Sequence, residues 1–215
     1  MVSCSVADRC SSLTMHHSLA HDKICKLNSP FTIHSSLHIF ATNNNIFMRY
    51  FIIGFMGSGK TYWGKQWSEA SELPFFDLDE EIEKKEGKSI SAIFAEKGEE
   101  AFRKMEADML AVFYKKDNFI LSCGGGTPCF HNNMKQMNKH GATIYLQSTV
   151  AELVQRLHAE KETRPLIAGM NDDVLAEFIS NKLNERSSVY SQAMYHLPTR
   201  YMHTDNFQKI IRRHG

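Results

Sequence analysis

The sequence has little of what membrane proteins, secreted proteins and nucleic-acid-binding proteins usually carry. Its 25 Lys and Arg residues are balanced by 24 Asp and Glu residues and form no basic run, so neither nucleic acid nor a membrane is an expected partner. No apolar run approaches the roughly 20 residues that a membrane-spanning helix needs. The five cysteines form no C-x-x-C pair, which argues against a disulfide framework or a zinc site and favours reduced thiols in the cytoplasm.

The start of the chain lacks the pattern of a folded domain. Residues 1–47 are rich in Ser, His and Asn and show no sustained apolar periodicity. Such a segment buries too little apolar surface to offset its ordering entropy, so we expect a disordered leader followed by one domain over 48–215. An organelle transit peptide would be richer in arginine than this stretch, which has only Arg9, and a secretory signal would need a longer apolar segment. The alternative is that translation begins at Met48.

Residues 54–61 read Gly-Phe-Met-Gly-Ser-Gly-Lys-Thr and match the G-x-x-x-x-G-K-[ST] pattern of a phosphate-binding loop. In such a loop, backbone N–H groups converge on phosphate oxygens, Lys60 reaches the β- and γ-phosphates, and the Thr61 hydroxyl ligates Mg²⁺. A β-prone apolar run over 49–53 precedes the motif, and apolar residues at helical spacing follow it. The phosphates would therefore lie at a helix N-terminus. The alternative, a glycine-rich turn with a chance lysine, does not account for these flanking elements.

Two carboxylates end a second short strand, which is predicted over 73–79. Asp77 and Asp79 are two residues apart, so along an extended chain their side chains would point to the same side. Open α/β sheets bind ligands at the carboxyl ends of their strands, which makes both residues candidates for a site. A second interpretation, compatible with the first, is that Asp79 caps the helix that begins at Glu80.

A helical piece over 89–94 and a longer helix over 98–115 are predicted next. Four residues of the longer helix share one face by i, i+3, i+4 and i+7 spacing: Glu99, Phe102, Arg103 and Glu106. On spacing alone, Arg103 beside Glu106 is a surface ion pair that contributes little stability. The spacing alone therefore assigns no chemical role to these four residues.

A third strand, predicted over 119–122, runs into a turn with three adjacent glycines at 124–126. Three glycines cost conformational entropy, a cost that makes sense where the backbone passes close to a ligand. A flexible loop is the alternative, and it is less suitable directly after a buried strand. Cys123 and Cys129 flank the turn and are expected to be inert packing residues.

Strands and helices alternate over the rest of the chain. We expect a short helix over 132–140, a strand over 142–146, helices over 150–159 and 172–190, a weak strand over 194–198 and a last helix over 206–213. The stretch 161–169 is polar at one end, is closed by glycine at the other, and suits a mobile flap. The alternation implies an α/β fold whose parallel sheet is covered on both faces.

Taken in order, these motifs resemble those of the shikimate kinases, which are P-loop enzymes related to the nucleoside-monophosphate kinases. The resemblance runs from about Met48 to the end of the chain. The matching pieces are Lys60 with Thr61, Asp77 with Asp79, Gly98 and Glu99 with Phe102, Arg103 and Glu106, Ser122 with Gly124, Gly125 and Gly126, Arg164-Pro165-Leu166, and Arg186 before Tyr190. The loop alone occurs in many nucleotide enzymes, whereas the ordered set is specific. The resemblance implies a three-layer αβα fold with a five-stranded parallel sheet of order 2-3-1-4-5 and a mobile lid.

The resemblance also implies a function. A cytoplasmic monomer would transfer the γ-phosphoryl group of ATP to the 3-hydroxyl of shikimate, with Mg²⁺, in chorismate and aromatic amino acid biosynthesis. Asp79 would hold the accepting hydroxyl as base or orienter, and Asp77 would hold Mg²⁺ through water. Nucleotide contacts are expected from Gly57, Ser58, Gly59, Lys60, Thr61, Tyr62, Arg156 and Arg164. Substrate contacts are expected from Asp79, Arg103, Glu106, Gly124, Gly125, Gly126 and Arg186.

Particular roles follow for the arginines. Arg103 and Arg186 would bind the shikimate carboxylate, for which a planar guanidinium fork is suited. Arg164 would close with the flap over the phosphates and stabilise the transferring charge. Arg156 is the nearest candidate for the arginine that stacks on adenine, although its spacing to Arg164 is about one residue off the family pattern. Thr61 and Tyr62 stand where Ser and Thr are common, which still leaves a hydroxyl for the metal.

Two other functions share part of this pattern. A gluconate-type kinase has the same loop, metal and lid, but the carboxylate-binding arginines together with the glycine turn favour shikimate. A nucleotide-dependent switch protein that phosphorylates no metabolite belongs to a different class. A GTP-dependent switch would carry a guanine-reading N-K-x-D motif, and Asn181-Lys182-Leu183-Asn184 ends in Asn instead.

Overall fold

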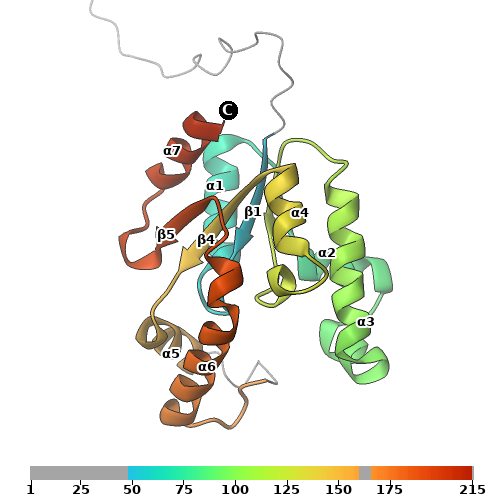
Figure 1. The fold of residues 1–215 in the computed structure, drawn as a ribbon, viewed down its shortest axis with the longest axis vertical. Helices are drawn as coiled ribbons and strands as arrows, with labels where there is room; N and C mark the ends of the chain where they lie inside the picture. The colour runs from blue at the N-terminus through green and yellow to red at the C-terminus, as the bar shows by residue number, and fades with distance from the viewer. Residues whose placement is uncertain (1–47, 160–165, 215) are drawn as a thin grey trace, which may run out of the picture. The chain divides into compact units, whose positions relative to one another are not determined.

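The structure of the chain is a computed structural model that describes residues 48–159 and 166–214. Its centre is a five-stranded parallel sheet with the strand order β2-β3-β1-β4-β5, as predicted (Figure 1). The strands are β1 (Arg49–Ile53), β2 (Phe75–Asp77), β3 (Phe119–Ser122), β4 (Ala142–Gln147) and β5 (Tyr195–Pro198). The predicted leader over 1–47 and the part of the predicted flap that holds Arg164 lie outside the described residues.

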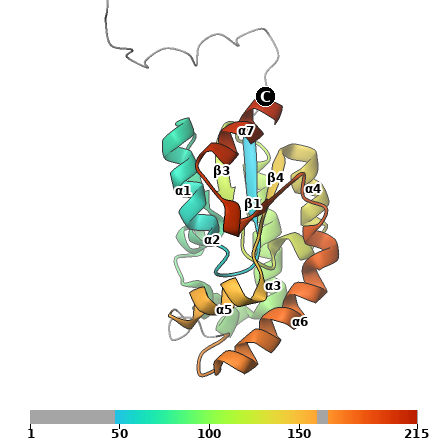
Figure 2. The same cartoon turned by 90° about the vertical axis from the view of Figure 1, so that its left-hand side faces the viewer.

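Helices cover both faces of this sheet (Figures 1 and 2). They are α1 (Lys60–Ser71), α2 (Leu78–Glu86), α3 (Ile90–Phe113), α4 (Asn133–His140), α5 (Val150–His158), α6 (Asp172–Tyr190) and α7 (Asp205–His214). Two short 3-10 helices, η1 (Thr127–Cys129) and η3 (Thr199–Tyr201), were not predicted. None of the described helices is both long enough and apolar enough to span a membrane.

Strand β1 lies in the middle of the sheet and is buried on both faces. Tyr50 and Ile52 point into a core shared with α1 and α7, where the ring of Trp67 stacks on that of Phe207 at 4.9 Å. Phe51 points to the opposite face of the sheet and packs in a second core with α2, α3 and α4. A third, smaller core joins α5 and α6 near the loop that follows β1. This alternation is what a continuous apolar run gives in a parallel sheet.

The second strand is shorter than predicted, and this moves one of the two carboxylates. The sequence predicted a strand over 73–79, but β2 ends at Asp77 and Asp79 lies in the first turn of α2. The prediction that the two side chains extend from one strand is therefore wrong. Asp77 itself is the N-cap, because its carboxylate accepts the backbone N–H of Asp79 at 3.1 Å. Three acidic residues in the first turn of α2 then favour helix over strand through the helix dipole.

The two helical pieces predicted after α2 are confirmed as the two parts of α3 (Ile90–Phe113), which meet at a break at Gly98. Helix α3 runs over both pieces, and Gly98 interrupts it with a non-helical φ of 77° and ψ of 175°. A left-handed φ is accessible to glycine at little cost, which explains a glycine at this point. The kink changes the direction of the chain just before the face that carries Arg103 and Glu106.

Candidate active site

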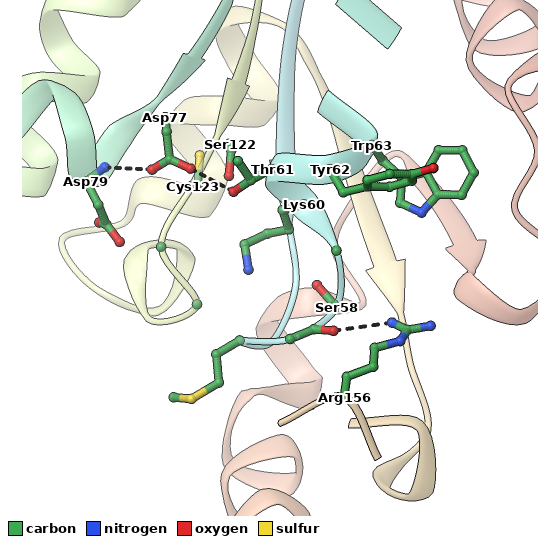
Figure 3. Close-up of a pocket in the computed structure, with 15 residues that line it drawn as sticks. Ser58, Lys60, Thr61, Tyr62, Trp63, Asp77, Asp79, Ser122, Cys123 and Arg156 are labelled. Atoms are coloured by element: carbon green, nitrogen blue, oxygen red, sulfur yellow. Dashed lines mark hydrogen bonds between the residues drawn. The ribbon is translucent and has the colours of Figure 1, made fainter. Parts of the chain in front are cut away.

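A cavity of about 660 Å³ lies at the carboxyl ends of β1, β2 and β3 (Figure 3). In a parallel sheet this is the edge at which ligands bind. The cavity is lined by three groups of residues: the phosphate loop and start of α1 (Met56 to Trp63), the carboxylates Asp77 and Asp79 with Ser122 to Gly125, and Arg156 of α5. The structure therefore brings the predicted loop, carboxylates and glycine turn to one place.

The phosphate loop has the backbone that its glycines predict. Gly57 and Gly59 adopt left-handed φ values of 76° and 88°, which side-chain-bearing residues rarely adopt. A Cβ atom on Gly54 would lie 2.8 Å from the carbonyl oxygen of Leu146 in β4. Helix α1 starts at Lys60 with no side-chain cap and no acidic residue in its first turn. Its first N–H groups are thus left for an anion, and a phosphate fits them.

Lys60 and Thr61 face the cavity from the start of α1 (Figure 3). The Lys60 ammonium donates to the carbonyl oxygen of Phe55 at 3.0 Å, which holds the side chain back along the loop. The Thr61 hydroxyl donates to Oδ2 of Asp77 at 2.9 Å. This hydroxyl–carboxylate pair joins α1 to the end of β2 and offers two oxygen ligands side by side.

Asp79 is the most strongly perturbed carboxylate that lines the cavity. Burial, and then the nearby charges of Asp77 and Glu106, raise its pKa from 3.8 to about 6, although Lys60 and Arg103 oppose the change. Its Oδ1 atom is buried and has no hydrogen-bond partner among the described residues. A buried oxygen without a partner costs free energy unless a ligand supplies a donor. Asp79 thus fits the role of an acceptor for a substrate hydroxyl.

Arg103 is held by carboxylates on its own helix. It donates to Glu106 at 2.8 Å and to Glu99 at 2.9 Å. The prediction of a plain surface pair is wrong for Arg103 and Glu106, because their side chains are 12% and 0% exposed. The guanidinium also lies 4.5 Å from the centre of the Phe130 ring. It also lies 5.5 Å from the centre of the Phe102 ring, so two ion pairs and two cation–π contacts fix its orientation.

Arg103 and Arg186 both lie against the glycine turn. A Cβ atom on Gly126 would lie 2.7 Å from the Arg103 guanidinium, and one on Gly125 would lie 3.3 Å from that of Arg186. The two arginines, on α3 and α6, therefore pack against consecutive glycines of one turn. The hydroxyl of Tyr190, one helical turn after Arg186, donates to the carbonyl oxygen of Gly125. The turn needs glycines because larger residues would displace these side chains.

The other end of the cavity carries Arg156 and Tyr62. Nη1 of Arg156 donates to the carbonyl oxygen of Gly57 at 3.3 Å, next to the phosphate loop (Figure 3). Tyr62 is 62% exposed, and its ring packs edge-on against Trp63.

Cys123 also lines the cavity. Burial raises the pKa of its thiol well above the ordinary value, so this cysteine suits packing rather than nucleophilic chemistry.

Comparison with known proteins agrees with this geometry. The sequence profile of the family described as shikimate kinase matches residues 56–214. The chain belongs to the shikimate kinase family. The shikimate kinase of Parabacteroides distasonis is 44% identical over 145 residues, which are 67% of this chain and 84% of that protein. The one from Phocaeicola vulgatus is 42% identical over 147 residues, 68% of this chain and 84% of that protein.

Solved structures of this family superpose on the fold. Shikimate kinase from Bacteroides thetaiotaomicron has a TM-score of 0.73 and 35% identity, covering 77% of this chain and 98% of that chain. Shikimate kinase from Acinetobacter baumannii, solved in complex with shikimate, has a TM-score of 0.68 and 29% identity, covering 78% of this chain and 92% of that chain.

Sequence reasoning missed several residues that a shikimate kinase site would use. Thr127 and Asn133 are buried behind the glycine turn, and Tyr190 fixes the Gly125 carbonyl. Met56 and Trp63 line the cavity without having been predicted to. The partners of Thr127 and Tyr190 are 21 and 65 positions away in the sequence, which no spacing or composition indicates. Met56 and Trp63 lie in and just after the loop motif, so the motif itself could have indicated them.

Proposed function

We propose that the chain phosphorylates shikimate with ATP, as its family does, and that the residues of this cavity divide the reaction between them as follows. The observation that carries the assignment is the position of two arginines against one glycine turn, close to a buried carboxylate oxygen that has no hydrogen-bond partner among the described residues. This arrangement suits an acceptor with a carboxylate at one end and a hydroxyl at the other. Since all of these residues belong to one chain, we expect a monomer to be sufficient for activity.

The phosphate loop binds the triphosphate of ATP. The N–H groups at the start of α1 hold phosphate oxygens, and Lys60 leaves the Phe55 carbonyl to contact the phosphates. Tyr62 and Arg156 lie where the nucleotide base and sugar would extend. Arg164, which is outside the described residues, closes over the phosphates and balances their charge.

Thr61 and Asp77 are the residues that fit Mg²⁺. Their side-chain oxygens are 2.9 Å apart, and both belong to the class of ligand that Mg²⁺ prefers. No group of three or more His, Cys, Asp and Glu side chains among the described residues could hold a metal ion. The site therefore fits an ion that takes its other ligands from phosphate and water, as Mg²⁺ usually does. When bound, Mg²⁺ neutralises phosphate charge during transfer.

Asp79 accepts the proton of the attacking hydroxyl and orients that hydroxyl towards the phosphate. A pKa of about 6 leaves the carboxylate ionised at neutral pH and makes it a stronger base than an ordinary aspartate. The shikimate carboxylate binds between Arg103 and Arg186. The N–H groups of Gly125 and Gly126 contact the ring hydroxyls, while Gly124 and Glu106 form the wall behind them.

A coupled assay of ADP release tests the assignment. Wild-type enzyme is given ATP with shikimate, ATP with gluconate, ATP alone, and GTP with shikimate. We expect rapid turnover only with ATP and shikimate. Lys60→Ala, checked for folding by circular dichroism, should lose about 10²–10³-fold in kcat because one preorganised contact to the transferring phosphate is gone. Faster turnover with gluconate, or normal kcat in folded Lys60→Ala, would contradict the proposal.

A further inference from the structure

The buried carboxylate that orients Arg103 has a second partner, which is Thr127. Oε2 of Glu106 accepts from Arg103 at 2.8 Å, whereas Oε1 accepts from the Thr127 hydroxyl. Both Glu106 and Thr127 are 0% exposed, so water does not compete for either bond. Thr127 therefore fixes one end of the carboxylate and Arg103 the other.

Thr127 is itself held in place by backbone contacts. It is the first residue of η1, and its N–H donates to the carbonyl oxygen of Gly124 at 3.1 Å. Its own carbonyl oxygen accepts from the buried side-chain amide of Asn133 at 2.9 Å. The hydroxyl therefore belongs to a rigid segment that starts at the glycine turn and is anchored to α4.

The Glu106–Thr127 pair lies between the two groups that would meet shikimate. A Cβ atom on Gly124 would be 2.9 Å from Glu106 Oε1, 2.9 Å from Thr127 Oγ1 and 3.3 Å from Asp79 Oδ1. Glu106 Oε1 and Asp79 Oδ1 thus both lie close to Gly124, and the carboxylate that binds Arg103 is near the carboxylate of Asp79. A change in its rotamer would disturb both the arginine and the reacting end of the site.

A buried carboxylate keeps its charge and its orientation only where donors replace the lost water. Burial raises the pKa of Glu106, whereas Arg103, the hydrogen bond from Thr127 and the charge of Arg186 lower it. Glu106 also lies near the Asp79 carboxylate and the thiols of Cys123 and Cys129. Thr127 is the neutral side chain that donates a hydrogen bond to Glu106.

We propose that Thr127 is a positioning residue for shikimate binding. Its hydroxyl holds Glu106 in the orientation that keeps the Arg103 guanidinium against Gly126, ready for a carboxylate. This inference rests on the proposed function. The competing explanation is that the hydroxyl only stabilises the fold, and kinetics can separate the two.

The experiment compares Thr127→Val, Thr127→Ala and Thr127→Ser with wild type. Valine keeps the shape but loses the donor, alanine loses the donor without adding a methyl group beside the carboxylate, and serine keeps the donor. We expect the valine and alanine variants to raise the shikimate KM about tenfold, because one hydrogen bond to a charged group is lost. The ATP KM should stay within about twofold of wild type, and serine should restore the shikimate KM.

Thr143→Val is the matched control. Thr143 is also 0% exposed, and its hydroxyl donates to Asn138 and accepts from the Met194 N–H, away from the cavity. This variant should lower the melting temperature while both KM values stay unchanged. A shikimate KM near the wild-type value in folded Thr127→Ala would overturn the inference. So would an equal rise in Thr143→Val, or a serine variant that behaves like alanine.

The same measurements separate failure of this inference from failure of the proposed function. If wild type releases no ADP in response to shikimate, the function itself is wrong. If wild type is active and Arg103→Ala weakens shikimate binding while the hydroxyl-free variants do not, only the role of Thr127 is wrong.

Discussion

Asp79 has properties that favour chemistry and disfavour folding. Its carboxylate is buried close to those of Asp77 and Glu106, which raises its pKa to about 6, and its Oδ1 atom has no partner among the described residues. A carboxylate in such a place is poised to accept a proton. The same environment makes its ionised form costly until a substrate hydroxyl arrives.

Asp79→Asn should remove most of the turnover and leave nucleotide binding intact. An amide cannot accept the hydroxyl proton, so we expect kcat to fall by about 10²–10⁴-fold. In wild type, kcat/KM for shikimate should decrease as the pH falls through about 6, because the carboxylate becomes protonated. The measurement is a pH series of initial rates with ATP affinity determined by calorimetry. An acidic limb centred near pH 4 would show that the pKa of the titrating group is not raised.

The same substitution should stabilise the ligand-free protein. The folded-state pKa lies above the ordinary value of 3.8, so between the two values the folded chain keeps a proton that the unfolded chain has released. The folded state therefore loses stability as pH rises from about 4 to 6, and the loss persists above pH 6. At pH 7.5, Asp79→Asn should gain on the order of 1–3 kcal/mol in unfolding free energy, and at pH 4 almost nothing.

Asp108→Asn is the control for that melt. Asp108 is half-exposed and pairs with Lys104 on the surface, so its replacement should change the unfolding free energy by no more than about 0.5 kcal/mol at either pH. Equal melting temperatures for Asp79→Asn and wild type at pH 7.5 would mean that burying the Asp79 charge does not destabilise the folded protein.

At the level of single residues, the sequence indicated chemistry better than position. Lys60, Thr61 and the first two glycines of the turn line the cavity because a local motif dictates local geometry. Asp79 was predicted on a strand and lies on a helix. The helix begins there because the Asp77 carboxylate accepts the Asp79 N–H, and residue spacing does not reveal such a capping bond. Thr127 could not have been predicted, since its partner is 21 residues away in the sequence.

Helix α1 is the element that joins the phosphate loop to the sheet, and it packs tightly against the sheet at Gly64. A Cβ atom there would overlap the ring of Phe75 in β2 and lie 3.2 Å from the Cδ1 atom of Ile52 in β1. The absent side chain lets α1 sit close enough for Thr61 to reach Asp77.

Gly64→Ala should therefore destabilise the protein even though alanine is the better helix former. Helix propensity favours alanine by about 1 kcal/mol, whereas overpacking costs typically about 1–3 kcal/mol and shifts the helix. We expect a lower midpoint in urea and a reduced kcat, because Thr61 moves away from Asp77. Lys65→Ala, at an exposed position of the same helix, should leave both unchanged. A Gly64→Ala protein as stable and active as wild type would show that the Phe75 ring can move aside at no measurable cost in stability.

Elements were predicted well where a long or strongly apolar segment defines them and less well where capping decides. Strand β3 and helix α6 occur at the predicted residues, because β3 is an apolar run and α6 is a long stretch without glycine or proline. The end of β2 was displaced, and η1 and η3 were missed, since short helical turns carry no periodic signal. These short pieces matter here, because η1 holds Thr127.

The described domain has its own cores, and every predicted site residue except Arg164 lies in its described part. We expect a chain that begins at Met48 to keep the kcat and the melting temperature of the full chain nearly unchanged. The backbone nitrogen of Met48 donates to Asn118 at 3.2 Å, and the new terminal amine can still do so. Insolubility of the shortened protein, or a melting temperature many degrees lower, would mean that residues 1–47 contribute to the fold.

At the scale of the whole molecule, the proposed shikimate site needs Arg103 and Arg186, which lie 83 positions apart in the sequence (186 − 103) and on different helices. Either change to alanine should weaken shikimate binding by about tenfold to a hundredfold, because each charge-assisted hydrogen bond contributes roughly 1.5–3 kcal/mol. ATP affinity should change little. Arg186→Ala is the cleaner test, since Arg103→Ala also leaves the buried Glu106 without its cation.

A shikimate analogue without its carboxylate distinguishes recognition of the acid from general damage to the site. Wild type should bind this analogue weakly, and neither arginine variant should weaken it much further. Arg103→Lys should resemble Arg103→Ala for shikimate itself, because a point charge cannot reproduce the two-pronged contact. Arg212→Ala, at an exposed position of α7, should match wild type for both ligands. If calorimetry found equal losses for the acid and its decarboxylated analogue, these arginines would not be reading the carboxylate. The glycine turn would then place them there for packing alone, and shikimate would have to be held by other groups.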